Sequence, residues 1–179
     1  MYSRVLIVLL CVAALGIGSL AYRWINAEEP AVDARLSEVS FNDLTGTPQN
    51  FSQWAGKLLV VNFWATWCPP CKQEMPEFVR AQQEWGPRGV QFIGIAIDDP
   101  EEVQAYLSVS PVNYPILIGE PGGPEWAAEL GDALQVLPFT AVIDRAGRVV
   151  RVKSGPYSRD ELMELLSGLV AKADDGRSG

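Results

Sequence analysis

The chain has 179 residues, of which 48% are hydrophobic, enough for one globular domain with a buried core. Its formal net charge of −8 offers no broad basic surface for phosphates, so we expect no nucleic-acid partner. The chain contains no histidine, which excludes Ser-His-Asp triads, Cys-His nucleophile pairs and His-ligated zinc. Three cysteines remain as candidate reactive groups: Cys68 and Cys71 lie close together, and Cys11 lies far from them.

The first 25 residues predict a membrane segment. Residues 5–21, VLIVLLCVAALGIGSLA, carry no charge, and their length is at the lower end of the roughly 17 to 25 apolar residues that span a bilayer. Arg4 before this run favours a cytoplasmic amino end. We therefore predict a single-pass anchor in a bacterial inner membrane, with the rest of the chain in the periplasm. The sequence SLA ending at Ala21 also resembles a signal-peptidase site, so a soluble periplasmic form cleaved near Ala21 is the alternative.

One domain is expected after this segment. Residues 26–36 are polar and predict a linker, so the domain is assigned to 37–172 and a disordered tail to 173–179. The domain begins with two short extended segments, 39–44 and 49–52, on either side of a turn sequence. These two segments predict an edge hairpin.

Strands and helices then alternate along the chain. Residues 57–64, KLLVVNFW, form a continuous apolar run, which is typical of a strand buried on both faces of a parallel sheet. We expect a helix over 70–85, a second buried strand over 90–97 and a helix over 100–109. The order strand, helix, strand, helix predicts an α/β fold.

The remaining elements are shorter and end in a helix. They are a strand at 114–118, a helix at 125–130 and two hairpin strands at 140–144 and 149–153. Ser158 is expected to cap a last helix that runs to about Val170.

The sequence FWATWCPPCKQEMPEF places two cysteines where a buried strand meets a helix. Cys68 falls near the helix N-terminus, where free amides and the helix dipole stabilise the thiolate that attacks disulfides. Cys71 lies one turn later on the same face, so it can attack the mixed disulfide and release the reduced partner. We expect Cys68 to be the nucleophile and Cys71 to be the more buried, resolving cysteine. Pro69 and Pro70 suit the first helical turn, which needs no intrahelical amide donors.

A stabilising disulfide and half of a zinc site are the other interpretations of the cysteine pair. A purely stabilising disulfide gains little from so short a loop, and half of a zinc site lacks its other ligands. We therefore expect no metal site and favour redox chemistry.

The sequence WATWCPPCKQEMPEF resembles the active site of the TlpA/ResA-type branch of the thioredoxin superfamily. The resemblance covers residues 39–166, including a segment at 90–130 that in this branch lengthens the fold by a strand and a helix. It implies a thioredoxin-like, three-layer α/β/α fold with a central mixed sheet. An extra N-terminal hairpin and the central strand-helix insertion are implied as well.

The resemblance also implies a third catalytic residue. Glu74 matches the glutamate that this branch places near its cysteines, where a partly buried carboxylate shuttles protons during resolution. A solvated helix glutamate is the alternative. Asn62 stands where thioredoxins proper carry a buried aspartate, as members of this branch commonly do.

Four residues are expected to contact the substrate. Leu137 and Pro138 precede a strand, as does the cis-proline loop that in the superfamily faces the cysteines, so we expect a cis bond at Pro138. Trp67 and Pro69 flank the nucleophile, with simple packing as the alternative for Trp67.

The function implied is a dithiol reductant of disulfides in exported proteins, resembling family members that keep apocytochrome c cysteines reduced during cytochrome c maturation. The redox-active disulfide Cys68–Cys71 needs no other cofactor, and the electrons would come from a membrane thiol-disulfide donor. An oxidase or isomerase is the first alternative, because direction depends on the redox potential. A thioredoxin-like copper chaperone is a second alternative, although such proteins have a wider cysteine spacing and a histidine.

Overall fold

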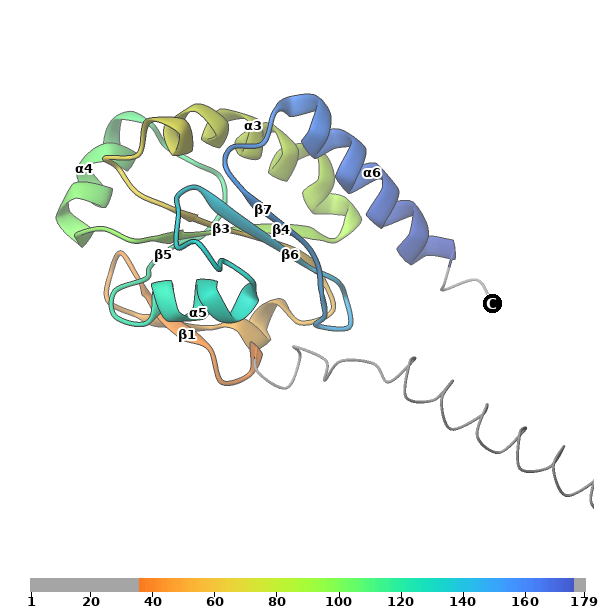
Figure 1. Cartoon of the computed structure of the whole chain (residues 1–179), viewed down its shortest axis with the longest axis horizontal. Helices are drawn as coiled ribbons and strands as arrows, with labels where there is room; N and C mark the ends of the chain where they lie inside the picture. The colour runs from red at the N-terminus through yellow and green to blue at the C-terminus, as the bar shows by residue number, and fades with distance from the viewer. Residues whose placement is uncertain (1–35, 176–179) are drawn as a thin grey trace, which may run out of the picture. The chain divides into compact units, whose positions relative to one another are not determined.

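The strands expected from the apolar runs are present in the computed structural model, which describes residues 36–175 (Figure 1). The strands of this part of the chain are β1 (Ser40–Asp43), β2 (Pro48–Asn50), β3 (Leu58–Trp64), β4 (Val90–Ala96), β5 (Ile116–Ile118), β6 (Phe139–Ile143) and β7 (Val149–Ser154). The helices are α3 (Pro69–Trp85), α4 (Pro100–Val109), α5 (Gly123–Leu130) and α6 (Arg159–Asp175), with short 3₁₀ helices η1 (Phe51–Trp54) and η2 (Gly86–Arg88).

The predicted membrane segment at residues 1–25 lies outside the described residues. The same holds for the predicted linker up to residue 35 and for the last four residues of the predicted tail. Within residues 36–175 no helix is both long and apolar enough to cross a membrane.

The sheet is mixed, as predicted, and its strands lie in the order β2-β1-β5-β4-β3-β6-β7. β4 pairs in parallel with β3 and β5, whereas the β1–β2, β1–β5, β3–β6 and β6–β7 pairs are antiparallel. The predicted N-terminal hairpin is β1–β2, and it forms one edge of the sheet. Residues 90–130, where the resemblance implies an inserted strand and helix, form β4, α4, β5 and α5.

Most element boundaries differ from the sequence-based expectation by one or two residues. Phe51 and Ser52 were expected to continue the second extended segment but begin η1, because the Asn50 side chain accepts a hydrogen bond from the Ser52 amide at 2.8 Å and starts a turn. Helix α6 continues to Asp175, past the expected end near Val170.

The alternation of side chains along β3 divides the interior into two cores. Leu58, Val60 and Trp64 pack on the face covered by α3, α4 and α6 (Figure 1). Leu59, Val61 and Phe63 pack on the opposite face, with residues of α5 and η1. All seven residues of the strand are buried because both faces are covered. The expected three-layer α/β/α architecture is therefore confirmed.

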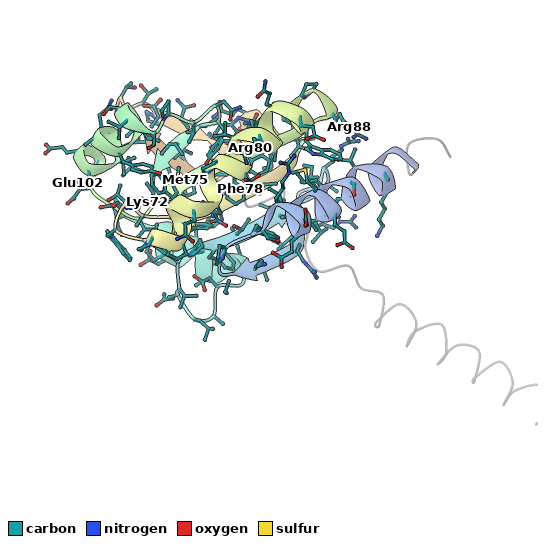
Figure 2. All side chains as sticks on the ribbon, turned by 90° about the horizontal axis from the view of Figure 1, so that it is seen from above. Lys72, Met75, Phe78, Arg80, Arg88 and Glu102 are labelled. Atoms are coloured by element: carbon teal, nitrogen blue, oxygen red, sulfur yellow. A yellow bond between two sulfur atoms is a disulfide. The ribbon has the colours of Figure 1, made fainter. Side chains whose placement is uncertain are left out.

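Helix α3 crosses one face of the sheet and carries the cysteine pair at its start. Figure 2 shows the helix running across the front of the molecule. Met75 and Phe78 of this helix are buried against the sheet, whereas Arg80 of the same helix is exposed to solvent. This amphipathic division fixes which face of α3 points toward the sheet, and Glu74 is buried on the same side.

Trp126 of α5 is central to the core on the other face. Its ring centroid lies 4.6 Å from that of Phe51, 5.6 Å from that of Phe63 and 5.7 Å from that of Phe41. Edge-on and tilted aromatic contacts of this kind add to the free energy of apolar burial. The indole therefore joins α5 and η1 to strands β1 and β3 of the sheet.

Replacing Trp126 with alanine is expected to lower the free energy of unfolding by about 3–5 kcal/mol, because the deletion leaves a cavity that its neighbours fill only in part. Urea unfolding followed by circular dichroism measures the change. Val109→Ala, at a residue that is 79% exposed, is the control and should stay within about 0.5 kcal/mol of the unmodified chain. A loss below about 1 kcal/mol in the Trp126 variant would contradict the central role of the indole.

Candidate active site

Cys68 and Cys71 form a disulfide where β3 leads into α3. Cys68 is the N-cap of α3, with extended backbone (φ −97°, ψ 99°), and its Sγ accepts a hydrogen bond from the Cys71 amide at 3.3 Å. Pro69 and Pro70 occupy the first two helical positions. The amides of this turn and the helix dipole stabilise negative charge on the Cys68 sulfur after reduction.

The two sulfurs differ in their access to solvent. Cys68 keeps 4% of its surface exposed, whereas Cys71 keeps none. Of the two sulfurs, the one of Cys68 is therefore the more accessible to another molecule. Cys71 is the more buried of the two, as expected, and the order of attack stays a prediction.

Glu74 lies one turn after Cys71 and is buried, with 2% of its surface exposed. Its Oε1 accepts a hydrogen bond from the Asn62 Nδ2 at 2.9 Å, and its Oε2 accepts one from the Tyr157 amide at 2.8 Å. Asn62 also donates to the Thr140 Oγ1 at 3.0 Å. The alternative of a solvated helix glutamate does not hold, because the side chain points into the core.

Burial raises the pKa of Glu74 from 4.5 to about 7, because an apolar surrounding disfavours the ionised carboxylate. The hydrogen bonds from the Tyr157 amide and the Asn62 side chain, and the charge of Lys153, act in the opposite direction but are outweighed. A carboxyl group with this pKa exchanges protons readily near neutral pH. Glu74 follows Cys71 by three residues, so the two side chains lie on the same side of α3.

Two partners of Glu74 could not be assigned from the sequence. Asn62 stands out as the polar residue in the apolar run VVNFW, which is a usable signal of a buried hydrogen bond. Tyr157 contributes only its backbone amide, so its residue type carries no signal.

A pocket of about 140 Å³ lies against Trp67, the residue that precedes Cys68. It is lined by Phe63, Trp67, Ile97, Pro124, Ala127, Asp132, Gln135 and Leu137. Trp67 is 66% exposed at its rim, which rules out simple packing of this side chain. Leu134 of the loop that leads to Leu137 is 74% exposed. The pocket thus brings together two of the four residues expected to contact a substrate, Trp67 and Leu137.

The other two expected substrate residues lie at the ends of neighbouring elements. Pro69 is exposed at the start of α3. Pro138 is buried just before β6, and the predicted cis bond between Leu137 and Pro138 is present. The Pro138 carbonyl oxygen accepts a hydrogen bond from the Gly155 amide at 2.8 Å.

The site and the fold together define a class of protein. A disulfide between a helix N-cap and the next turn, above a buried carboxyl group with a pKa near neutrality, is the arrangement of a thiol-disulfide oxidoreductase. Among residues 36–175 no group of three or more His, Cys, Asp or Glu side chains is arranged to hold a metal ion.

Comparisons with known proteins agree with this class. The sequence profile of the Redoxin family matches residues 30–166. The thiol-disulfide oxidoreductase ResA of Halalkalibacterium halodurans is 30% identical over 88% of this chain and 91% of that relative. The thiol:disulfide interchange protein HelX of Rhodobacter capsulatus is 32% identical over 84% of this chain and 73% of that relative. The crystal structure of a thioredoxin-family thiol:disulfide interchange protein from Chlorobium tepidum superimposes with a TM-score of 0.67 at 30% identity, covering 74% of this chain and 92% of that one.

The chain belongs to the Redoxin family, and the resemblance to its TlpA/ResA-type members is confirmed. The enzyme class expected from the motif, a thiol-disulfide oxidoreductase, is confirmed with it.

Glu74 is expected to make the stability of the oxidised protein fall as the pH rises from about 4.5 to about 7. The native state keeps the Glu74 proton in this range, whereas the unfolded chain releases it near pH 4.5. Between pH 5 and 8 the free energy of unfolding should fall by about 2–3 kcal/mol. Urea unfolding at each pH measures this slope, and Glu74→Gln should remove it.

Few other side chains titrate in this pH window. The chain has no histidine, and the cysteines of the disulfide do not titrate. Asp43 and Glu161 have pKa values lowered to about 2, mainly by side-chain hydrogen bonds from Thr45 and Lys153, so their stabilising effect is lost only at more acid pH. Glu84→Gln, at an exposed position of α3, is the matched control and should retain the slope. An unaltered slope in Glu74→Gln would contradict the raised pKa.

Proposed function

We propose that this thiol-disulfide oxidoreductase is an extracytoplasmic dithiol reductant that reduces disulfides in exported proteins such as apocytochrome c, and so serves cytochrome c maturation. The observation that carries the proposal is the Cys68–Cys71 pair above the buried carboxyl group of Glu74. The names of the relatives support thiol-disulfide exchange. The resemblance to TlpA/ResA-type proteins supports the reductive direction and the class of substrate.

In the first step the Cys68 thiolate attacks one sulfur of the substrate disulfide. A mixed disulfide forms between Cys68 and that sulfur, and the other substrate sulfur leaves as a thiolate. Cys68 keeps a small exposed fraction whereas Cys71 keeps none, and this difference and its place at the positive end of α3 support this role.

In the second step Cys71 resolves the mixed disulfide. Its thiol gives a proton to the Glu74 carboxylate, and the resulting thiolate attacks the Cys68 sulfur. The Cys68–Cys71 bond forms as the bond to the substrate breaks, and the second substrate sulfur leaves. The substrate has then gained two electrons and the cysteine pair has lost two. A membrane thiol-disulfide donor returns two electrons and restores both thiols.

The substrate chain is held beside Cys68 by the pocket and its rim. Trp67 and Leu137 provide apolar surface in this pocket. Pro69 follows Cys68 directly, and the resemblance implies that the Pro138 backbone faces the reacting sulfur. The largely apolar lining of the pocket suits a polypeptide with an apolar side chain next to its cysteine.

The proposed location rests on the N-terminal segment. Residues 1–25 would anchor the chain in the inner membrane, a linker at 26–36 would follow, and the catalytic domain at 37–172 would lie in the periplasm. Cleavage near Ala21 would release the same domain in soluble form on the same side of the membrane.

The cysteine roles predict different outcomes for the two serine variants. Cys68→Ser should abolish the reduction of insulin disulfides, because no nucleophile remains on the accessible side. Cys71→Ser should attack the substrate but fail to release it, so a mixed disulfide accumulates and is visible on a non-reducing gel. Glu84→Gln should keep full activity as a control. Insulin reduction by Cys68→Ser would disprove the assignment of the nucleophile.

The reductive direction is tested by the equilibrium potential of the Cys68–Cys71 couple against glutathione. A potential near the −270 mV or so of thioredoxin is expected, whereas a value near the roughly −120 mV of strong periplasmic oxidants would make the chain an oxidase.

The pocket rim predicts a specific kinetic effect. Trp67→Ala should lower kcat/KM for a protein substrate by about tenfold, because an exposed aromatic contact at the site is lost. The same variant should react with a small disulfide such as oxidised glutathione at the unmodified rate, since so small a substrate reaches the sulfur without the rim. Val109→Ala removes exposed apolar surface at the end of α4 and is the control. Equal losses with both substrates would mean that Trp67 affects the sulfur itself.

A further inference from the structure

The loop between β7 and α6 joins the two halves of the site. This β7–α6 loop, residues 155–158, donates the Gly155 amide to the Pro138 carbonyl oxygen at 2.8 Å. Two residues later it donates the Tyr157 amide to the Glu74 Oε2 at 2.8 Å. One short segment therefore holds the buried carboxyl group and also the loop that flanks the substrate.

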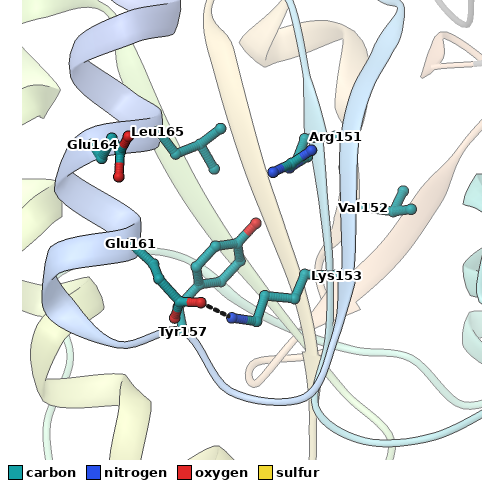
Figure 3. Close-up of a pocket in the computed structure, with 7 residues that line it drawn as sticks. All are labelled: Arg151, Val152, Lys153, Tyr157, Glu161, Glu164 and Leu165. Atoms are coloured by element: carbon teal, nitrogen blue, oxygen red, sulfur yellow. Dashed lines mark hydrogen bonds and ion pairs between the residues drawn. The ribbon is translucent and has the colours of Figure 1, made fainter.

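An ion pair lies on the outer side of the β7–α6 loop. Figure 3 shows Lys153 of β7 and Glu161 of α6 on either side of Tyr157, with the Lys153 Nζ 2.7 Å from the Glu161 Oε1. The same ammonium group lies 4.7 Å from the centroid of the Tyr157 ring. Glu161 also accepts the Ser158 amide at 2.9 Å through its Oε2. Lys153 thus contacts the side chain of Tyr157, whose amide binds Glu74.

We propose that Lys153 and Glu161 are positioning residues for thiol-disulfide exchange, because together they hold the Tyr157 amide in place on Glu74. The proposal rests on the proton-carrying role of Glu74 in the proposed function. It assigns a task to an ion pair that contacts neither cysteine.

The exposure of this ion pair argues against a mainly stabilising task. The side chains of Lys153 and Glu161 are 26% and 53% exposed, and ion pairs as accessible as this contribute little to the free energy of folding. Loss of the ion pair should therefore change the titration of Glu74 more than it changes the unfolding temperature.

The charges that face Glu74 give Lys153 a second effect on it. Lys153 is the cation of the described residues whose charge lowers the pKa of Glu74. The phenols of Tyr114 and Tyr157 have pKa values raised, mainly by burial, so both are neutral near pH 7. On its own helix, Glu74 lies one turn after Cys71. Removal of Lys153 should therefore raise the proton affinity of Glu74 through the lost charge and through a less firmly held amide.

Lys153→Met tests both effects. In the oxidised protein labelled with ¹³C at glutamate carboxyl groups, the Glu74 titration should move to higher pH. The Tyr157 amide should exchange with deuterium about tenfold faster. In the reduced protein, resolution of a mixed disulfide at pH 6.5 should slow by about threefold or more, because less Glu74 carboxylate is present to accept the Cys71 proton. The rate should return to the unmodified value at pH 9.

Three further variants separate positioning from general disturbance. Lys153→Arg keeps the charge and the contact with the ring and should restore the titration. Glu161→Gln keeps the charge of Lys153 but removes its ion-pair partner, so the Tyr157 amide should again exchange faster with deuterium. Arg159→Met removes an exposed cation from the first turn of α6 and should leave the titration of Glu74 unchanged.

A double variant separates this inference from the proposed function. In a Glu74→Gln background, Lys153→Met should have no additional effect on resolution. If Glu74→Gln itself leaves the pH dependence of resolution unchanged, the proton role of Glu74 fails. If Glu74→Gln slows resolution but Lys153→Met moves neither the Glu74 titration nor the Tyr157 exchange rate, the positioning role fails alone. Equal effects of Lys153→Met and Arg159→Met would also overturn it.

Discussion

The buried carboxyl group of Glu74 is the constraint on which the site depends. A carboxyl group in an apolar interior needs hydrogen-bond donors for both oxygens, or its burial costs several kcal/mol. One donor comes from Asn62 on β3 and the other from the backbone at Tyr157. Helix α3, the central strand and the β7–α6 loop are therefore held in one arrangement by the same group that is proposed to move protons.

The rest of the fold places the sulfurs relative to that group. Strand β3 is buried along its whole length, so its end is a rigid point from which α3 starts. Cys68 occupies the N-cap of α3 and Cys71 lies in its first turn. The helix that stabilises the thiolate also carries Glu74, which is buried one turn after Cys71. The residues proposed for attack, resolution and proton transfer are thus spaced along a single helix by its own geometry.

Burial of Glu74 makes its carboxylate a stronger base but lowers the free energy of unfolding above pH 7. A carboxylate exposed to solvent would be ionised throughout the neutral range and would be a weak base toward the Cys71 thiol. Burial brings its pKa close to 7 at the expense of stability above that pH, whereas the amide of Tyr157, the side chain of Asn62 and the charge of Lys153 limit the shift. The accessible ion pair of Lys153 and Glu161 lies outside the core. Its loss should therefore change the pKa of Glu74 with little effect on the free energy of unfolding.

The sequence by itself determined the local chemistry. The apolar run of β3, the Cys-Pro-Pro-Cys turn and the capping position of Cys68 are all short-range features, and short-range patterns set strands, helix starts and sulfur activation. The resemblance added Glu74 and the cis bond at Pro138. Only the tertiary structure decided what surrounds Glu74, because one donor lies 12 residues away on another element and the other lies 83 residues away. A backbone amide can be supplied by nearly any residue type, so the Tyr157 contact leaves no trace in the sequence. The pocket of Trp67 and Leu137 was decided in the same way, since its lining comes from segments that only packing brings together.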